Sequence, residues 1–152
     1  MILLDTNVVS ALMRREPDPA VVAWLDDQAA ESVWTTSITV FEVQTGLELL
    51  RPGRRRRELE HAFEGLLADD LAGRVQPFDE AAALVAGGIA ASQQRAGRGL
   101  EVRDVQIAGI AGARKATLAT RNLRHFQGLT VALVDPWSGR GSSPPPKASR
   151  SR

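Results

Sequence analysis

The stretch MILLDTNVVS (residues 1–10) decides the fold. Met1 to Leu4 form a continuous apolar run, which is typical of a central parallel strand that is covered on both faces. Asp5 follows this run directly, and a polar turn then precedes the apolar residues of a short helix. Because ligands of open α/β sheets bind beyond the carboxyl ends of the strands, we expect Asp5 at the edge of the sheet where such a site forms.

Strand and helix patterns alternate along the rest of the chain. Further strands are expected over residues 32–38, 74–78, 117–122 and 130–134. Helices are expected from Pro19 onward and over residues 39–50, 54–73, 79–97 and 103–115. This alternation predicts an α/β fold with a mostly parallel central sheet and helices on both of its faces.

The composition predicts one globular domain followed by a tail. The 152 residues are 43% hydrophobic and 24% charged, which is ordinary for a globular protein with a single core. Residues 1–137 form the expected domain, and residues 138–152 form a basic, Ser- and Pro-rich tail that we expect to be disordered. The sequence has neither a run long enough for a membrane span nor a secretory signal pattern, so we expect a cytoplasmic protein without membrane contact.

The residue types exclude several classes of site. The chain has no cysteine, so disulfides, zinc–thiolate sites and cysteine nucleophiles are excluded. His61 and His125 are the two histidines of the sequence, which makes a histidine-rich zinc site or a histidine-based triad improbable. Acidic residues are plentiful, and chemistry based on carboxylates is therefore the expectation.

Three acidic residues follow predicted element boundaries, and each also has a purely structural interpretation. Asp5 suits a turn or helix cap, Glu42 suits a capping box with Thr39, and Asp104 suits the first turn of a helix. All three nevertheless fall where one edge of the sheet could gather them. Converging carboxylates repel one another unless a cation or protons intervene, and Mg²⁺ or Mn²⁺ prefers such oxygen ligands. Metal-dependent hydrolysis of a phosphodiester is the reaction class that fits.

Five motifs in order carry a family resemblance. They are LLDTN (residues 3–7), TSITVFEVQTG (36–46), GLEVRDVQIAGIA (99–111), LATRNLRHF (118–126) and VALVDPW (131–137). Together they resemble the PIN domain and, within it, the VapC or FitB-like toxins of type II toxin–antitoxin systems. The resemblance extends from Met1 to Trp137 and implies a PIN-like three-layer sandwich.

The resemblance also implies a function and assigns site residues. The implied activity is that of a Mg²⁺- or Mn²⁺-dependent endoribonuclease in which a metal-activated water attacks an RNA phosphodiester. Asp5 and Asp104 match the metal-binding aspartates, while Glu42 completes the acidic site and positions the water. A homodimer and a cognate antitoxin whose C-terminal segment blocks the active site are the implied protein partners.

The residues around these acids follow the family pattern with one departure. Thr6 and Asn7 match polar residues beside the first aspartate, and Thr120 matches the threonine at the end of the fourth strand. Many relatives carry a further acid in the loop that follows, where this chain has Asn122 and His125. We expect Asn122 to supply a neutral oxygen or to orient a water, and we expect one metal, or a second that is recruited only with substrate.

Two other functions fit parts of the pattern. Asp5 could act as a covalent nucleophile in a phosphohydrolase, although such enzymes usually have a second Asp where Asn7 stands. Alternatively, the domain could be a PIN-fold module that does not cleave RNA and that regulates transcription together with a DNA-binding antitoxin. The missing fourth acid favours this second alternative.

Several remaining residues are expected to be structural. His61 should face solvent, and the aromatic residues should lie in the core or at a dimer interface; these are Trp24, Trp34 and Phe63. The arginine run over residues 54–57 and the basic tail are either solvated or in contact with RNA or an acidic partner.

Overall fold

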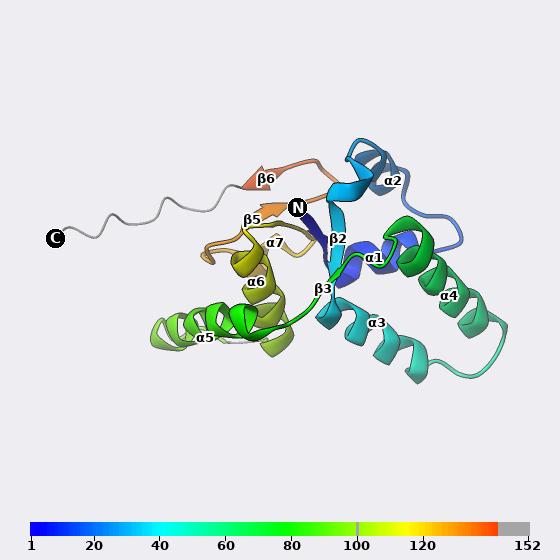
Figure 1. The fold of residues 1–152 in the computed structure, drawn as a ribbon. Helices are drawn as coiled ribbons and strands as arrows, with labels where there is room; N and C mark the ends of the chain where they lie inside the picture. The colour runs from blue at the N-terminus through cyan, green and yellow to red at the C-terminus, as the bar shows by residue number, and fades with distance from the viewer. Residues whose placement is uncertain (100, 143–152) are drawn as a thin grey trace.

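A computed structural model describes residues 1–99 and 101–142 (Figure 1). Within these residues one sheet has six strands in the order β3-β2-β1-β4-β5-β6. The strands are β1 (Ile2–Leu4), β2 (Val33–Thr36), β3 (Val75–Gln76), β4 (Thr117–Ala119), β5 (Ala132–Val134) and β6 (Gly141–Ser142). The first five are parallel, and β6 pairs antiparallel with β5. The mostly parallel sheet predicted from the alternating pattern is confirmed.

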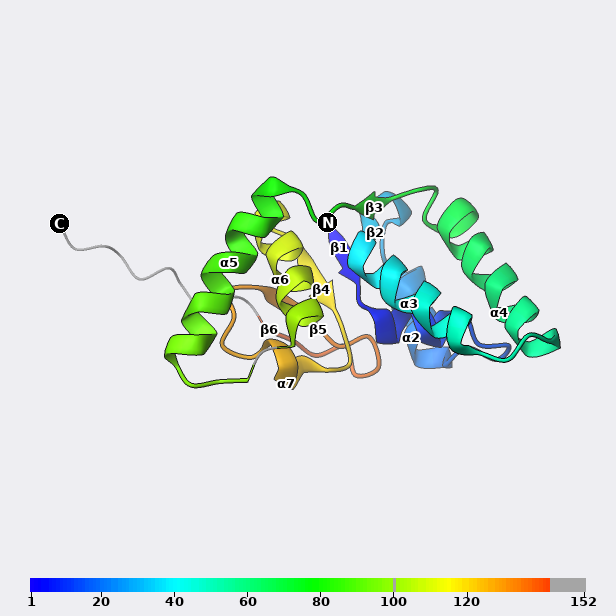
Figure 2. The ribbon, with the colours of Figure 1, turned by 90° about the horizontal axis from the view of Figure 1, so that it is seen from below.

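Helices cover both faces of this sheet. They are α1 (Thr6–Leu12), α2 (Pro19–Asp26), α3 (Ser37–Leu49), α4 (Arg54–Gly65), α5 (Glu80–Arg95), α6 (Val102–Arg114) and α7 (Leu123–Phe126), with a short 3-10 helix at Ala30–Ser32 and a π-helix at Leu66–Asp70. Figure 2 shows α5 and α6 on one side of the strands and α3 and α4 on the other. The fold is a three-layer α/β sandwich.

Neighbouring residues of β1 belong to the two separate cores of this sandwich. Leu3 packs in a cluster with α5, α6 and α7, and Leu4 packs in a second cluster with α1 to α4. Successive side chains of a strand point to opposite faces, so a strand that is covered on both faces needs an unbroken apolar run. Both leucines are fully buried, as the apolar start of the chain predicts.

The connectivity places a crevice between β1 and β4. From β1 the chain moves outward to β2 and β3 on one side, and it then returns to β4 and β5 on the other side. The order of strands therefore reverses between β1 and β4, where the backbone N–H of Asp5 donates to the carbonyl of Ala119 at 2.9 Å. Ligand sites of such sheets form at this kind of reversal, beyond the carboxyl ends of the strands.

The start of α3 differs from the expected capping box. Thr36 is the N-cap, and its Oγ1 accepts a hydrogen bond from the Thr39 backbone N–H at 3.0 Å. The strand is shorter and the helix begins earlier than predicted, because the Thr36 side chain satisfies one of the free N–H groups of the first turn. The predicted pairing of Thr39 and Glu42 as a capping box is therefore wrong, and the Glu42 side chain is available elsewhere.

The beginning of the expected tail is ordered. Asp135 accepts hydrogen bonds from the backbone N–H of Trp137 at 2.9 Å and from Ser138 Oγ at 3.0 Å, and the turn leads into β6. Residues 138–142 of the predicted tail thus contain part of this turn and the strand β6, which pairs with β5. Residues 143–152 lie outside the described residues. No helix in residues 1–99 and 101–142 is long and apolar enough to cross a membrane.

The close packing of α5 and α6 depends on a glycine. A Cβ at Gly109 would lie 2.6 Å from the Ala82 carbonyl oxygen and 2.6 Å from the Ala86 Cβ. Because Gly109 has no side chain, α5 and α6 can pack closely against each other, and this contact fixes the position of α6.

We predict that Gly109→Ala destabilises the protein by about 1–3 kcal/mol, because the added methyl group must displace the backbone of α5. Gly88→Ala, within α5, is the matched control because no atom lies within 4 Å of its added Cβ. The control should raise stability by up to about 1 kcal/mol through helix propensity. Urea unfolding measures both, and equal stability of the two variants would contradict the packing argument.

Candidate active site

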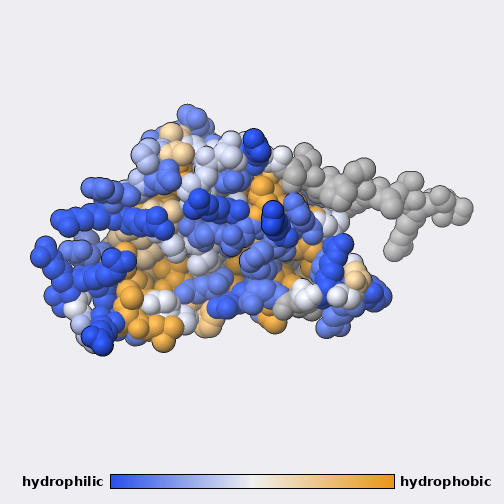
Figure 3. Space-filling view, turned by 180° about the vertical axis from the view of Figure 1, so that it is seen from behind, coloured by the Kyte–Doolittle hydropathy of each residue, from blue (hydrophilic) through white to orange (hydrophobic). Residues whose placement is uncertain are grey.

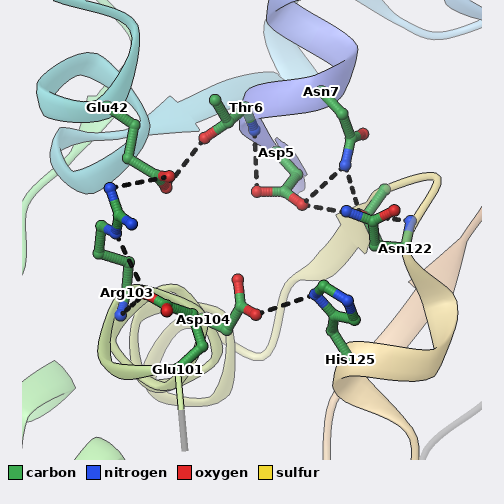
Figure 4. Close-up of polar contacts among 10 residues, drawn as sticks. Asp5, Thr6, Asn7, Glu42, Glu101, Arg103, Asp104, Asn122 and His125 are labelled. Atoms are coloured by element: carbon green, nitrogen blue, oxygen red, sulfur yellow. Dashed lines mark hydrogen bonds and ion pairs between the residues drawn. The ribbon is translucent and has the colours of Figure 1, made fainter. Parts of the chain in front are cut away.

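A polar cavity of about 380 Å³ opens at the carboxyl ends of β1 and β4. Its walls come from the turns after these strands, from α3, from the start of α6 and from α7 (Figure 4). The lining side chains include all four residues that the sequence predicts to be catalytic; these are Asp5, Glu42, Asp104 and Asn122. The fold therefore brings together residues that are up to 117 positions apart in the sequence.

Asp5 is the buried member of this group, with 5% of its surface exposed. It is the N-cap of α1, and its Oδ1 accepts the Thr6 backbone N–H at 2.8 Å. Its Oδ2 accepts from Thr120 Oγ1 at 2.7 Å and from Asn7 Nδ2 at 3.3 Å. Burial raises the pKa of Asp5, the hydrogen bonds from Thr120 and Thr6 oppose this shift, and the nearby charge of Asp104 adds to it.

The Thr120 hydroxyl ties the turn after β4 to the turn after β1. Besides donating to Asp5, its Oγ1 accepts from Asn7 Nδ2 at 3.2 Å and from the Asn122 backbone N–H at 3.1 Å. Asn7 completes the link, because its Oδ1 accepts the Arg121 N–H at 3.1 Å. These contacts confirm that Asn7 and Thr120 lie beside the first aspartate.

Glu42 reaches the cavity from α3. Its Oε1 accepts a hydrogen bond from Thr6 Oγ1 at 3.0 Å, so Thr6 contacts Asp5 through its backbone and Glu42 through its side chain. The other oxygen of Glu42 lies 3.7 Å from Arg103 Nη1, and Arg103 Nε lies 3.1 Å from Glu101 Oε1. An arginine between two glutamates thus borders the acidic site.

Asp104 enters from the first turn of α6, where the helix dipole favours an acid. Its Oδ2 lies 3.1 Å from His125 Nδ1, so α7 contacts α6 across the cavity. Partial burial raises the pKa of Asp104, and the neighbouring His125 opposes that shift. Asn122 is different, because its backbone binds Thr120 while its exposed side chain lines the cavity.

Sequence reasoning missed Glu101 and Arg103 as cavity residues. Their position just before Asp104 could have indicated that they line the cavity, because residues at the same helix start lie at the same edge of the sheet. Nothing in the sequence, however, indicates that Arg103 pairs with Glu42, since this contact joins α6 to α3 across 61 positions.

The donor set suits a hydrated divalent ion rather than a closed metal cage. In the described part of the chain no three His, Asp or Glu side chains are close enough to enclose a metal. Asp5 and Asp104 nevertheless line one cavity, and Asp104 raises the pKa of Asp5 through charge repulsion. A hydrated Mg²⁺ needs only one or two carboxylates, so these two residues fit such an ion.

The remaining candidate residues lie away from this cavity. In the arginine run, Arg54 Nε lies 3.0 Å from Glu58 Oε1, and Arg56 is paired with Glu48 at 2.8 Å and Glu60 at 2.6 Å. These two arginines therefore stabilise α4 and its contact with α3. The other residues predicted to be structural have the expected exposure. His61 is exposed, Phe63 is buried, and Trp24 and Trp34 are half-buried.

Comparison with known proteins identifies the family. The model of the PIN domain family matches residues 2–129 of this chain. The VapC ribonuclease Y4jK of Sinorhizobium fredii is 38% identical over 137 residues, which span 90% of this chain and 98% of that protein. The toxin FitB of Neisseria gonorrhoeae is also 38% identical, over 90% of this chain and 99% of its own length.

A solved structure supports the same assignment. The structure of FitAB bound to an IR36 DNA fragment contains a chain that superimposes with a TM-score of 0.81 at 38% identity, covering 90% of this chain and 96% of that one. The chain therefore belongs to the PIN domain family and is one of the VapC/FitB-like toxins within it.

Proposed function

We propose that this protein is a Mg²⁺- or Mn²⁺-dependent endoribonuclease and the toxin of a type II toxin–antitoxin pair. The observation that carries the proposal is the pair Asp5 and Asp104, two carboxyl groups whose pKa values are raised by burial and which line one open polar cavity. Perturbed acids in a cavity at a strand reversal are typical of a functional site. The relationship to a VapC ribonuclease supports RNA as the substrate.

Asp5 and Asp104 are the residues that would hold the ion. A bound divalent cation would lower the pKa of a water, polarise the phosphodiester and stabilise the leaving oxygen. Asp5 is rigid because both of its oxygens accept hydrogen bonds, and Asp104 is oriented by His125. This fixed geometry avoids the reorganisation that mobile carboxylates would need.

Glu42 and Asn122 complete the proposed machinery. Thr6 and Arg103 hold the two oxygens of Glu42 from opposite sides, so this carboxylate is a fixed acceptor that can position the attacking water. The Asn122 side chain offers a neutral oxygen and an N–H donor at the same cavity. An amide here adds no negative charge, which suits a site that binds a polyanion.

The proposed protein partners are an antitoxin and a second copy of this chain. A groove of about 670 Å³ between α1 and α4 has apolar Leu12 and Leu59 in its lining, with Arg14, Arg15 and Arg55 beside them. Such a groove suits an amphipathic segment of an acidic antitoxin. Hydrophobic patches also lie between hydrophilic residues on the face shown in Figure 3.

The proposed homodimer is supported by an exposed apolar side of α3. Phe41 is 60% exposed and Leu49 is 81% exposed, and both line the same shallow surface on this helix. Large apolar side chains that share an exposed patch are typical of protein interfaces.

We predict that Asp5→Asn and Asp104→Asn each reduce RNA cleavage by about 100-fold or more. Loss of a metal ligand removes several kcal/mol of charge stabilisation in the transition state, and each 1.36 kcal/mol is about a factor of ten. The measurement is cleavage of a mixed RNA pool in Mg²⁺, Mn²⁺ or EDTA. Asp69→Asn, at an exposed acid outside the cavity, is the matched control and should keep full activity.

Several results would contradict the proposed ribonuclease. Cleavage that persists in both variants or in EDTA would contradict the proposal that the two aspartates bind a metal required for the reaction. If the wild type cleaves no RNA with either ion but still binds DNA together with its partner, the protein is a regulatory module without nuclease activity. A phosphoryl group trapped on Asp5 would instead identify a phosphohydrolase.

We also predict that Mn²⁺ binding weakens as the pH decreases. Metal binding requires ionised carboxylates, and burial raises the pKa of both Asp5 and Asp104. Protons therefore compete for these groups at a higher pH than they would for exposed acids. Calorimetric titration with Mn²⁺ from mildly acidic to neutral pH measures the affinity directly. An affinity that is independent of pH, or that is unchanged in Asp5→Asn, would refute this assignment.

A further inference from the structure

A second cavity, of about 490 Å³, adjoins the acidic one. It is lined by Arg98 and Gly99 after α5, by the start of α6 and by the region of α7, and Figure 2 shows the end of α5 and α7 along the same edge of the molecule. The two cavities share Glu101, Asp104 and His125 in their linings. A ligand in the second cavity would therefore lie directly beside the proposed reaction centre.

The charge of the second cavity differs from that of the first. Arg98 and Arg124 both line it, and within residues 1–99 and 101–142 neither guanidinium takes part in an ion pair. Arg103, by contrast, is already held by two glutamates. Two arginines without carboxylate partners, next to a cluster of acids, are suited to contact phosphate groups of a polyanion.

The Arg98 guanidinium lies beside the turn at Gly128. Gly128 has a φ of +81°, and a Cβ placed there would lie 2.8 Å from Arg98 Nη1. A side chain at position 128 would thus be strained by the positive φ, and the flexible Arg98 side chain would have to shift to make room for it. Glycine at this position leaves the space that Arg98 occupies.

Amide and apolar side chains complete the lining. Gln93 and Gln127 each offer a donor and an acceptor, which is the equipment for hydrogen bonds to the edge of a base. Val105 and Leu129 supply apolar surface that can contact the face of a base. The volume lies within the range of about 300–1,000 Å³ that is usual for small-molecule sites.

We propose that this second cavity binds the nucleotide next to the phosphodiester that is cleaved. Arg98 and Arg124 contact its phosphate, and Gln93 and Gln127 contact its base. The inference rests on the proposed ribonuclease function and adds the residues that select the cleavage position. Sequence-specific recognition of RNA generally uses unstacked bases of single strands, which a cavity of this kind can accept.

Binding of RNA without cleavage tests the phosphate contacts. The probe is a fluorescently labelled, single-stranded RNA pool of random sequence, and its Kd is measured in EDTA at several salt concentrations. Arg98→Ala and Arg124→Ala should each raise Kd about tenfold or more. Each should also lower the slope of log K against log salt by about 0.7, the value for one phosphate contact to a single strand.

The controls separate this subsite from a general loss of charge or fold. Arg95→Ala removes an exposed arginine from the last turn of α5 that does not line the cavity, and it should leave Kd and slope unchanged. Arg98→Lys and Arg124→Lys keep the charge and should retain most of the slope. Unaltered Kd and slope in both alanine variants would overturn the proposal, even if cleavage still depends on Asp5.

Mapping of cleavage sites tests the base contacts. In a random RNA pool with Mn²⁺, Gln93→Ala and Gln127→Ala should change the preferred nucleotide next to the cut, whereas Gln94→Ala should not. An unchanged preference in both variants would overturn the assignment of the base contacts. If the wild type binds RNA through Arg98 and Arg124 but never cleaves it, the phosphate contacts are supported, whereas the nuclease function and the position of the subsite next to a cleaved bond are overturned. A wild type that neither binds nor cleaves RNA would overturn both.

Discussion

The short hydrogen bond from Thr120 Oγ1 to Asp5 Oδ2, at 2.7 Å, joins the ends of the two strands between which the sheet reverses its order. The carboxylate lies at the edge of two hydrophobic cores, where an ionised group without partners would strongly destabilise the fold. Thr6, Asn7 and Thr120 supply these partners. In the part of the chain that the structure describes, no buried side-chain polar atom lacks a hydrogen bond. The network therefore makes a buried acid compatible with the fold. Its hydrogen-bond donors are neutral groups, so they do not cancel the charge of an ionised Asp5.

The charges around this acid are distributed unevenly. Glu42 lies near Arg103, so part of the negative charge is compensated by the chain itself, whereas Asp104 forms a hydrogen bond with His125. Asp5 has neutral hydrogen-bond donors and no cationic partner within the described residues. The proposed cation would therefore interact most directly with Asp5. In the neighbouring cavity, Arg98 and Arg124 form no ion pair within the described residues, and this is where we propose that a substrate phosphate binds.

Much of this arrangement could be predicted from local patterns. The unbroken apolar run of β1 predicted burial on both faces, and its end placed Asp5 at the sheet edge. Asp104 could be placed because an acid in the first turn of a helix is favoured by the backbone. The family resemblance supplied Thr120, whose role depends on a contact over 115 positions. Patterns of local spacing contain no information on such a pair.

The mistakes have equally physical causes. The helix around Glu42 was placed two residues late because Thr36 and Thr39 are both good caps, and only the end of β2 decides between them. The ordered turn after Asp135 was missed because a Ser- and Gly-containing segment appears flexible unless an edge strand is available for pairing. Both errors arise where a tertiary contact selects one of several local conformations.

The packing of α5 against α6 links the two cavities to one structural constraint. Glu101, Arg103 and Asp104 all lie at the start of α6. The distance between α6 and α5 is set by the contact of Gly109 with Ala82 and Ala86. A shift of α6 would move the Asp104 carboxylate, the contact of Arg103 with Glu42 and the wall between the cavities together. The site therefore depends on a small residue in the core as much as on its own charged groups. Because the effect of such a shift is shared by both cavities, metal binding and RNA positioning are expected to change together when this contact is altered.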